Sequence, residues 1–142
     1  MEESIKAERM NLAETEPAMY SPLVLAYLGD AVYELMIRSK VVRQGNTQVN
    51  KMHKKSASLV KAQTQASMIR LLEPDLTKEE LAIFKRGRNA KSVTMAKHAT
   101  MAEYRMATGM EALVGYLYLS EQFERLLELI SLGLKKIEER ET

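Results

Sequence analysis

Hydrophobic residues recur along this chain at the three- and four-residue spacing of α-helices. Over residues 121–139 they form a single stripe, made of Phe123, Leu126, Leu127, Ile130 and Leu134. No stretch alternates apolar and polar residues for long enough to indicate a β-strand, and only six Gly and three Pro are present. The pattern predicts an all-α fold.

Start and stop signals divide the chain into a series of helices. We expect them over residues 21–43, 46–53, 56–72, 77–87, 102–119 and 121–139. Ser21 and Pro22 suit the N-cap and first turn of the first helix, and Gly45 suits its stop. Thr77 and Glu80 have the spacing of a capping box.

Some positions within this series are less regular. Asn46 is expected to cap the short second helix, and residues 102–119 form either one continuous helix or one that is broken near Gly109. Residues 88–100 lack a helical period and are expected to form a loop. No repeat or interdomain linker interrupts the chain of 142 residues, which predicts a single domain with its core over about residues 20–140.

The two most apolar segments each carry a carboxylate in an apolar setting. "LAYLGDAVYELMI", residues 25–37, holds Asp30 in its middle. In "MATGMEALVGYLYLS", residues 106–120, the acid is Glu111. Residues 23–28 are apolar on all sides, so we expect this part of the first helix to lie deep in the helical bundle.

A glycine accompanies each of these carboxylates. Gly29 directly precedes Asp30, and Gly115 lies one helical turn after Glu111. Because a Gly within a helix costs about 1 kcal/mol relative to Ala, we expect the glycines to allow a close approach of two helices. If both mark the same crossing, Asp30 and Glu111 face one cleft.

A buried carboxylate without a partner is destabilising or stays protonated, so each of these acids needs compensation. One alternative is a structural ion pair with a cation such as Arg38 or Arg105. The other is a metal site. The chain has no Cys, and hard oxygen ligands suit Mg²⁺, which binds few protein carboxylates and keeps several waters.

The distribution of charge adds a second candidate site. The net charge is only +2, but no Asp or Glu occurs over residues 35–72 or 85–102. The second of these spans carries a group of cations, namely Lys85, Arg86, Arg88, Lys91 and Lys97. A basic middle predicts a basic face, which either binds a polyanion such as nucleic acid or only keeps the protein in solution.

Nothing in the sequence indicates secretion or a membrane partner. The N-terminus is charged and lacks the apolar core of a signal peptide. The longest apolar run, residues 106–120, is too short to cross a bilayer and contains Glu111. We therefore expect a soluble, cytoplasmic protein.

Three stretches together resemble the ribonuclease III family. "LAYLGDAVYEL", residues 25–35, is similar to the signature helix of that family, and "TGMEALVGYLYL", residues 108–119, is similar to its second catalytic block. "KRGRNAKS", residues 85–92, together with the shortness of the chain, resembles the Mini-ribonuclease III branch in particular. The resemblance covers nearly the whole chain and implies a single, homodimeric, ribonuclease III-like endonuclease helical domain.

The resemblance also implies roles for individual residues. Asp30 and Glu111 match the catalytic carboxylates that hold the metal, and Mg²⁺ is the implied cofactor. Two further carboxylates of the larger enzymes are replaced here, by Ala26 and Thr108. Either water and Thr108 fill those places, or Glu34 contributes from one helical turn beyond Asp30.

The implied activity is cleavage of double-stranded RNA by a homodimer, in which metal-activated water attacks phosphorus. The implied products carry a 5′ phosphate, a 3′ hydroxyl and a short 3′ overhang. The implied substrate is the precursor of large-subunit (23S) ribosomal RNA, and the need for a ribosomal-protein helper stays open. The apolar helix at residues 23–37 is the expected dimer interface.

No double-stranded-RNA-binding domain is expected after Thr142, so the catalytic domain itself must hold the duplex. We expect RNA contacts from Lys85, Arg86, Arg88, Asn89, Lys91 and Lys97. Two other functions remain open at this point. One is a catalytically inactive duplex-RNA-binding module with the same fold, and the other is a helical protein–protein adaptor whose basic face is incidental.

Overall fold

The computed structural model describes residues 15–91 and 99–141, and these residues form helices and no strand. The all-α prediction is therefore confirmed. In chain order the elements are η1 (Pro17–Met19), α2 (Pro22–Arg43), α3 (Val49–Val60), α4 (Ala62–Leu72), η2 (Glu73–Asp75), α5 (Lys78–Asn89), α6 (Met101–Leu119) and α7 (Phe123–Glu141). Within the described ranges, no helix has the length and apolar character needed to cross a membrane.

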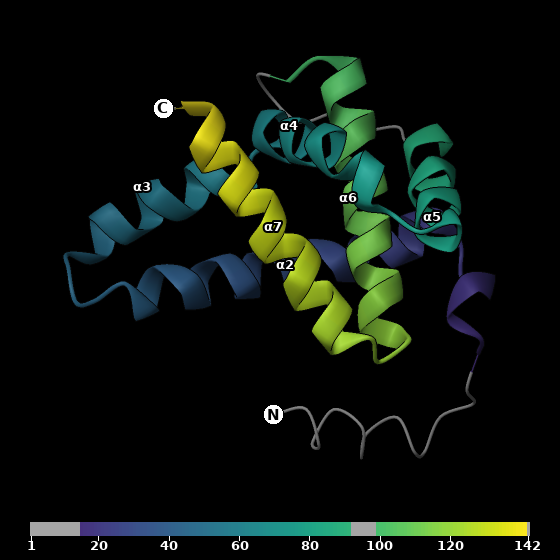
Figure 1. The fold of residues 1–142 in the computed structure, drawn as a ribbon, viewed down its shortest axis with the longest axis horizontal. Helices are drawn as coiled ribbons and strands as arrows, with labels where there is room; N and C mark the ends of the chain where they lie inside the picture. The colour runs from purple at the N-terminus through teal and green to yellow at the C-terminus, as the bar shows by residue number, and fades with distance from the viewer. Residues whose placement is uncertain (1–14, 92–98, 142) are drawn as a thin grey trace.

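Helix α6 is the centre of the fold, and α2, α4, α5 and α7 pack around it (Figure 1). Its second half is almost continuously buried, from Ala107 to Leu117. The largest buried side chains of the neighbouring helices, including Tyr33 on α2, Met68 on α4 and Phe84 on α5, belong to the same hydrophobic cluster. One core therefore connects every large helix that packs on α6.

Two close helix crossings fix the position of α6. A Cβ atom on Gly29 would lie 1.7 Å from the carbonyl oxygen of Glu111, and one on Gly115 would lie 2.0 Å from the carbonyl oxygen of Leu25. The expectation that Gly29 and Gly115 mark one crossing is confirmed. A second crossing joins α5 to α6, where a Cβ on Gly87 would lie 2.9 Å from the Cα of Gly109.

The predicted boundary between the second and third helices is wrong. The chain was expected to change direction between residues 53 and 56, but α3 continues to Val60 and the break falls at Lys61, whose backbone is extended. Side chains replace the missing helical hydrogen bonds there, because Thr64 donates to the carbonyl of Ser58 and Gln65 donates to that of Val60. No Gly or Pro marks this corner in the sequence.

Other helix boundaries differ by smaller amounts. Helix α2 begins at the Ser21 cap as predicted, and the Thr77 capping box of α5 is present. Helix α3, however, is preceded by Gln48 rather than capped by Asn46. Helix α6 continues through Gly109 without a break, since Gly109 packs against Phe84 of α5.

The remaining boundary differences lie at the ends of α5 and α7. Helix α5 reaches Asn89, two residues beyond the expected end, so the start of the expected loop is helical. Residues 92–98 of that loop lie outside the described residues. Helix α7 begins at Phe123 because Glu121 has a positive φ of 58° and ends the preceding turn.

The prediction that residues 23–28 lie deep in the bundle is wrong for this chain by itself. Leu25 is buried at the crossing with α6, but Leu23, Val24 and Tyr27 are 40%, 49% and 84% exposed. Helix α2 touches α6 along one side only, so its other apolar side faces outward. The segment is apolar on two sides. One side packs on α6, and no described residue covers the other.

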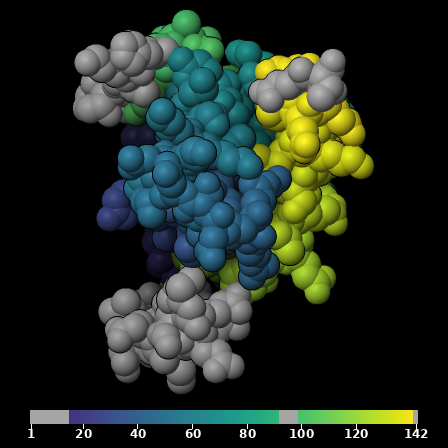
Figure 2. All heavy atoms as spheres, turned by 90° about the vertical axis from the view of Figure 1, so that its left-hand side faces the viewer, coloured from purple at the N-terminus to yellow at the C-terminus, as the bar shows by residue number. Residues whose placement is uncertain are grey.

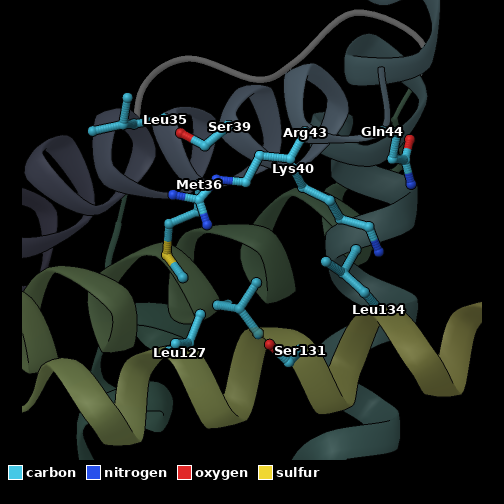
Figure 3. Close-up of a pocket in the computed structure, with 10 residues that line it drawn as sticks. Leu35, Met36, Ser39, Lys40, Arg43, Gln44, Leu127, Ser131 and Leu134 are labelled. Carbon is cyan, nitrogen blue, oxygen red and sulfur yellow. The ribbon is translucent and has the colours of Figure 1, made fainter.

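The C-terminal half of α2 and helix α3 form a hairpin that extends away from the rest of the molecule (Figure 1). Figure 2 views the molecule from the side of this hairpin, with α7 along one edge. A groove of about 580 Å³ lies between this half of α2 and α7 (Figure 3). Neither Asp30 nor Glu111 lines this groove.

Candidate active site

The crossing of α2 and α6 brings Asp30 and Glu111 together. Gly29 packs directly on the backbone of Glu111, so the next residue of α2, Asp30, lies beside that carboxylate. Asp30 is exposed, whereas Glu111 is partly buried. The two acids therefore lie next to each other, although Asp30 is more open to solvent than its apolar neighbours in the sequence indicate.

The environment of Glu111 disfavours its charged form. Burial raises the pKa of Glu111, and the hydrogen bond and negative charge of Asp30 add to this effect, so that the pKa is about 8. A hydrogen bond from Gln65 acts in the opposite direction. Near neutral pH the Glu111 carboxyl therefore favours its protonated form.

The cations that could have formed a structural pair with these acids lie elsewhere. Arg38 pairs with Glu34 on the surface of α2, with 3.0 Å between Nη2 and Oε1. Arg105 is exposed on α6. Among residues 15–91 and 99–141, no Lys or Arg forms a salt bridge with Asp30 or Glu111. An ion pair with Arg38 or Arg105 therefore does not account for the two carboxylates.

Gln65 is a site residue that the sequence interpretation missed. It lies on the first turn of α4, is 2% exposed, and donates from Nε2 to the Val60 carbonyl at 2.8 Å and to Glu111 Oε2 at 3.5 Å. A signal was present, because Gln65 stands four residues before Ile69 and seven before Leu72 on the apolar stripe of that helix. A polar side chain in such a stripe needs a buried partner.

Tyr33 lies next to the same carboxylate. Its hydroxyl donates to the Leu59 carbonyl at 2.7 Å, which satisfies the end of α3. Burial raises the pKa of the Tyr33 phenol, and the charge of Glu111 raises it further. Tyr33 therefore stays neutral at physiological pH and acts as a hydrogen-bond donor in the wall of the site.

The structure places the two additional candidate ligands in other contacts. The Glu34 carboxylate accepts a hydrogen bond from Arg38. Thr108 is buried one turn before Glu111, and its hydroxyl donates to the Tyr104 carbonyl of its own helix at 3.0 Å. Neither observation adds a third charged ligand to the pair.

Asp30 and Glu111 nevertheless form a donor set that suits one hydrated Mg²⁺ ion. No group of three or more His, Cys, Asp or Glu residues in the described part of the chain is arranged to hold a metal. Mg²⁺, however, is commonly bound through one or two carboxylates and several waters. The buried Oε1 of Gln65 has no hydrogen-bond donor in the described structure, so it is available to accept one from such a water.

The basic stretch after Phe84 belongs to α5, which packs on α6. Gly87 packs on Thr108, Gly109 and Ala112 of α6, within one turn of Glu111. The charged and polar residues of this stretch that are exposed are Lys85, Arg86, Asn89 and Lys91. The cationic end of α5 is therefore held against the helix that carries Glu111.

The predicted RNA-contacting residues are not equivalent in this structure. Arg86 donates to the carbonyls of Ala18 and Tyr20, at 3.0 and 3.3 Å, and so holds the segment before α2. Arg88 lies over the Phe84 ring, 5.6 Å from its centroid, and also donates to Asn89. Lys97 lies outside the described residues.

Comparisons with known proteins identify the family of this chain. The family model described as "Ribonuclease III domain" matches residues 23–122, which include both carboxylates. The Mini-ribonuclease 3 of Clostridium tetani is 51% identical over 120 residues, covering 84% of this chain and 80% of the relative. The Mini-ribonuclease 3 of a Thermoanaerobacter species is 50% identical over 119 residues and covers 84% of each chain.

A solved structure agrees as well. The crystal structure of a protein from Fusobacterium nucleatum superimposes with a TM-score of 0.79 at 32% sequence identity, covering 86% of this chain and 99% of that one. The family match, the close relatives and the fold thus point to the same conclusion. The chain belongs to the ribonuclease III family, as an endoribonuclease of the Mini-ribonuclease 3 kind.

Proposed function

We propose that this protein is a Mg²⁺-dependent endoribonuclease that cleaves double-stranded RNA. The observation that carries the proposal is the meeting of Asp30 and Glu111 at a glycine crossing, where the pKa of Glu111 is raised to about 8 and no described cation compensates the pair. A site of this kind is costly for an unliganded protein and suits a divalent cation.

In this proposal Asp30 and Glu111 hold Mg²⁺. The ion would activate water for attack on phosphorus and stabilise the leaving oxygen, which gives a 5′ phosphate and a 3′ hydroxyl. The protein supplies the geometry. The close approach at Gly29 fixes the distance between the two helices, and the hydroxyl of Tyr33, held by the Leu59 carbonyl, closes one wall.

We infer that the active form is a homodimer that uses the outward side of α2. Leu23, Val24 and Tyr27 present apolar surface there, beside the exposed Met19. A second copy is the natural cover, because an isologous interface buries the same patch on both chains. Asp30 lies on the next turn of this helix, so the two sites of a dimer would flank the interface and face one duplex.

We propose that the end of α5 holds the RNA backbone. Lys85, Asn89 and Lys91 are exposed next to the helix that carries Glu111, and Arg88 and Lys97 extend the same basic stretch along the sequence. Duplex RNA is recognised mainly through its phosphates, 2′-hydroxyls and shape. The lysine cluster at residues 51–61, made of Lys51, Lys54, Lys55 and Lys61, is the alternative grip.

The proposed substrate is the precursor of 23S ribosomal RNA, processed in the cytoplasm. This part of the proposal rests on the resemblance to the Mini branch of the family. It leaves open whether a ribosomal protein must first shape the RNA.

The test is to incubate the purified protein with a structured ribosomal precursor and with a plain RNA duplex, in Mg²⁺ or in EDTA. Cleavage of both strands that leaves a 5′ phosphate and requires the cation is the expected result. Binding without cleavage would instead support the inactive RNA-binding module. Weak binding that does not depend on salt would support the protein–protein adaptor.

The dimer is tested separately by sedimentation at micromolar concentration. Wild type is expected to sediment as a dimer, and Tyr27→Glu is expected to shift it toward the monomer because the mutation places charge on the apolar patch. The matched control is Leu127→Glu, since Leu127 is an apolar side chain that is 61% exposed on a different helix, α7. A fully active wild-type monomer would contradict the inference.

A further inference from the structure

The corner between α3 and α4 is built from side chains that also surround the carboxylates. The last carbonyls of α3 lose their helical donors when the chain turns at Lys61. Thr64 satisfies the Ser58 carbonyl at 2.6 Å, and Tyr33 of α2 satisfies that of Leu59 at 2.7 Å. Gln65 satisfies the Val60 carbonyl at 2.8 Å.

Of these three side chains, Gln65 also donates a hydrogen bond to Glu111. Because the Val60 carbonyl can only accept, the Nε2 atom of Gln65 must face it, and this fixes the orientation of the amide. The same Nε2 also donates to Glu111 Oε2, with 3.5 Å between the nitrogen and the oxygen. The corner therefore transmits its fixed position to the Glu111 carboxylate through a single buried side chain.

The other end of the Gln65 amide has a different status. Its Oε1 atom is buried without a hydrogen-bond donor in the described structure, while the side chain as a whole is 2% exposed. A glutamine that only capped α3 would leave this acceptor unsatisfied at a cost. An acceptor kept free beside two carboxylates suits a donor that arrives with the ligand, such as a water on a hydrated cation.

We propose that Gln65 is a positioning residue of the cation site, in which Nε2 orients Glu111 and Oε1 accepts a hydrogen bond from a water of the bound divalent ion. The inference rests on the proposed function of Asp30 and Glu111. The hydrogen bond from Gln65 Nε2 to Glu111 Oε2 is long, at 3.5 Å, and is expected to shorten when Glu111 binds the cation. Outer contacts of this kind typically contribute about 10- to 100-fold to metal affinity.

The experiment measures Mg²⁺ affinity by calorimetry on the intact protein without RNA, for wild type, Gln65→Leu, Gln65→Met and Thr64→Val. Both Gln65 variants keep the volume and burial of the side chain but lose its polar atoms. They are expected to bind Mg²⁺ about 10-fold more weakly or worse. Thr64→Val is the matched control, because it removes a bond of the same corner that does not reach Glu111.

Activity provides the second readout. At low Mg²⁺ the Gln65 variants are expected to have a lower kcat with an unchanged KM for RNA, and excess Mg²⁺ is expected to restore the rate. Wild-type Mg²⁺ affinity in either folded Gln65 variant would overturn the inference. So would an equal loss in Thr64→Val, or loss of the folded state in both Gln65 variants, because the glutamine would then be structural.

The failure of this inference can be distinguished from failure of the proposed function. If wild type does not cleave duplex RNA with Mg²⁺, or Asp30→Asn cleaves it normally, the assignment of the carboxylates fails whatever Gln65 does. If wild type cleaves and Asp30→Asn does not, the Gln65 variants test the positioning role alone.

Discussion

Two glutamates that pack between helices have opposite surroundings. Glu80, on α5, is 4% exposed and accepts two hydrogen bonds of 2.8 Å from the Arg125 guanidinium of α7. These bonds lower the pKa of Glu80. Glu111, on α6, faces a second carboxylate instead of a cation, and burial together with the hydrogen bond and charge of Asp30 raises its pKa to about 8.

The difference separates a structural acid from one that is prepared for a ligand. Arg125 also donates to the Asp75 carbonyl at 2.7 Å, so it joins η2, α5 and α7. The charge of Glu80 is therefore neutralised within the protein and stabilises the fold. The charge of Glu111 is not neutralised by any described cation, and in the proposed function a bound Mg²⁺ would stabilise the ionised form.

The largest effect is expected when the carboxylates of the site are changed. Asp30→Asn and Glu111→Gln should each lower the rate of duplex cleavage by on the order of 10³-fold or more. RNA affinity and the folded state should be retained, because each substitution keeps the shape of the side chain. Single-turnover cleavage and RNA binding measured on the same preparations check this, and Glu34→Gln is the matched control on α2. Near-normal turnover in either variant would sink the assignment.

The second effect tests the structural member of the comparison. Arg125→Met should lower the free energy of unfolding by about 3 kcal/mol, because it leaves Glu80 buried without its cation. Arg38→Met removes an exposed pair with Glu34 and should cost well under about 1 kcal/mol. Denaturant unfolding of both variants measures the contrast. The rate of cleavage by folded Arg125→Met should stay close to that of wild type. Equal stability losses in the two variants would contradict the structural role of the Arg125–Glu80 pair.

The parts of this structure that the sequence predicts are those with local signals. The start of α2 follows from Ser21 and Pro22, and the capping box of α5 follows from Thr77 and Glu80. The pairing of Asp30 with Glu111 was predictable because a glycine within one helical turn of each acid indicated a close helix crossing. In each case a few neighbouring residues carry enough physical information.

The parts that were missed depend on contacts distant in sequence. The break at Lys61 is held by Tyr33, which lies on another helix, so no local pattern marks it. Gln65 acquires its role only when α4 packs on α6. The outward position of Tyr27 was missed because an exposed apolar surface has the same composition as a buried one.

The comparison also predicts opposite pH responses for the two glutamates. The folded pKa of Glu111 is raised from the usual 4.5 to about 8, so between these values the unfolded chain releases a proton that the folded chain keeps. In EDTA, stability should therefore fall as pH rises through this window and level off above it. Glu80 acts in the other direction, since its lowered pKa contributes stability that is lost as the pH falls.

Glu111→Gln isolates the first of these responses. In EDTA, the free energy of unfolding of Glu111→Gln minus that of wild type should rise by about 2 kcal/mol when the pH is raised from acidic values to 8. This value is below the full shift because Glu111 is only partly buried. Chemical denaturation at several pH values measures the difference. A difference that does not change with pH would show that Glu111 ionises normally and would remove the contrast with Glu80.

The smallest effect extends the comparison to the cations of α5. Arg86 is bound to the carbonyls of Ala18 and Tyr20, whereas Lys85 and Lys91 are exposed. Each phosphate contact adds about 0.9 to the slope of log affinity against log salt, by analogy with B-form DNA. Replacing Lys85 and Lys91 with Ala should therefore flatten this slope by about 2 and weaken binding for every RNA sequence alike. The rate at saturating RNA should change much less because Asp30 and Glu111 are intact.

The matched control is Arg86→Ala, which should change protein stability more than the salt slope. An unchanged slope in the variant that lacks both Lys85 and Lys91 would assign the grip to the lysine cluster at residues 51–61.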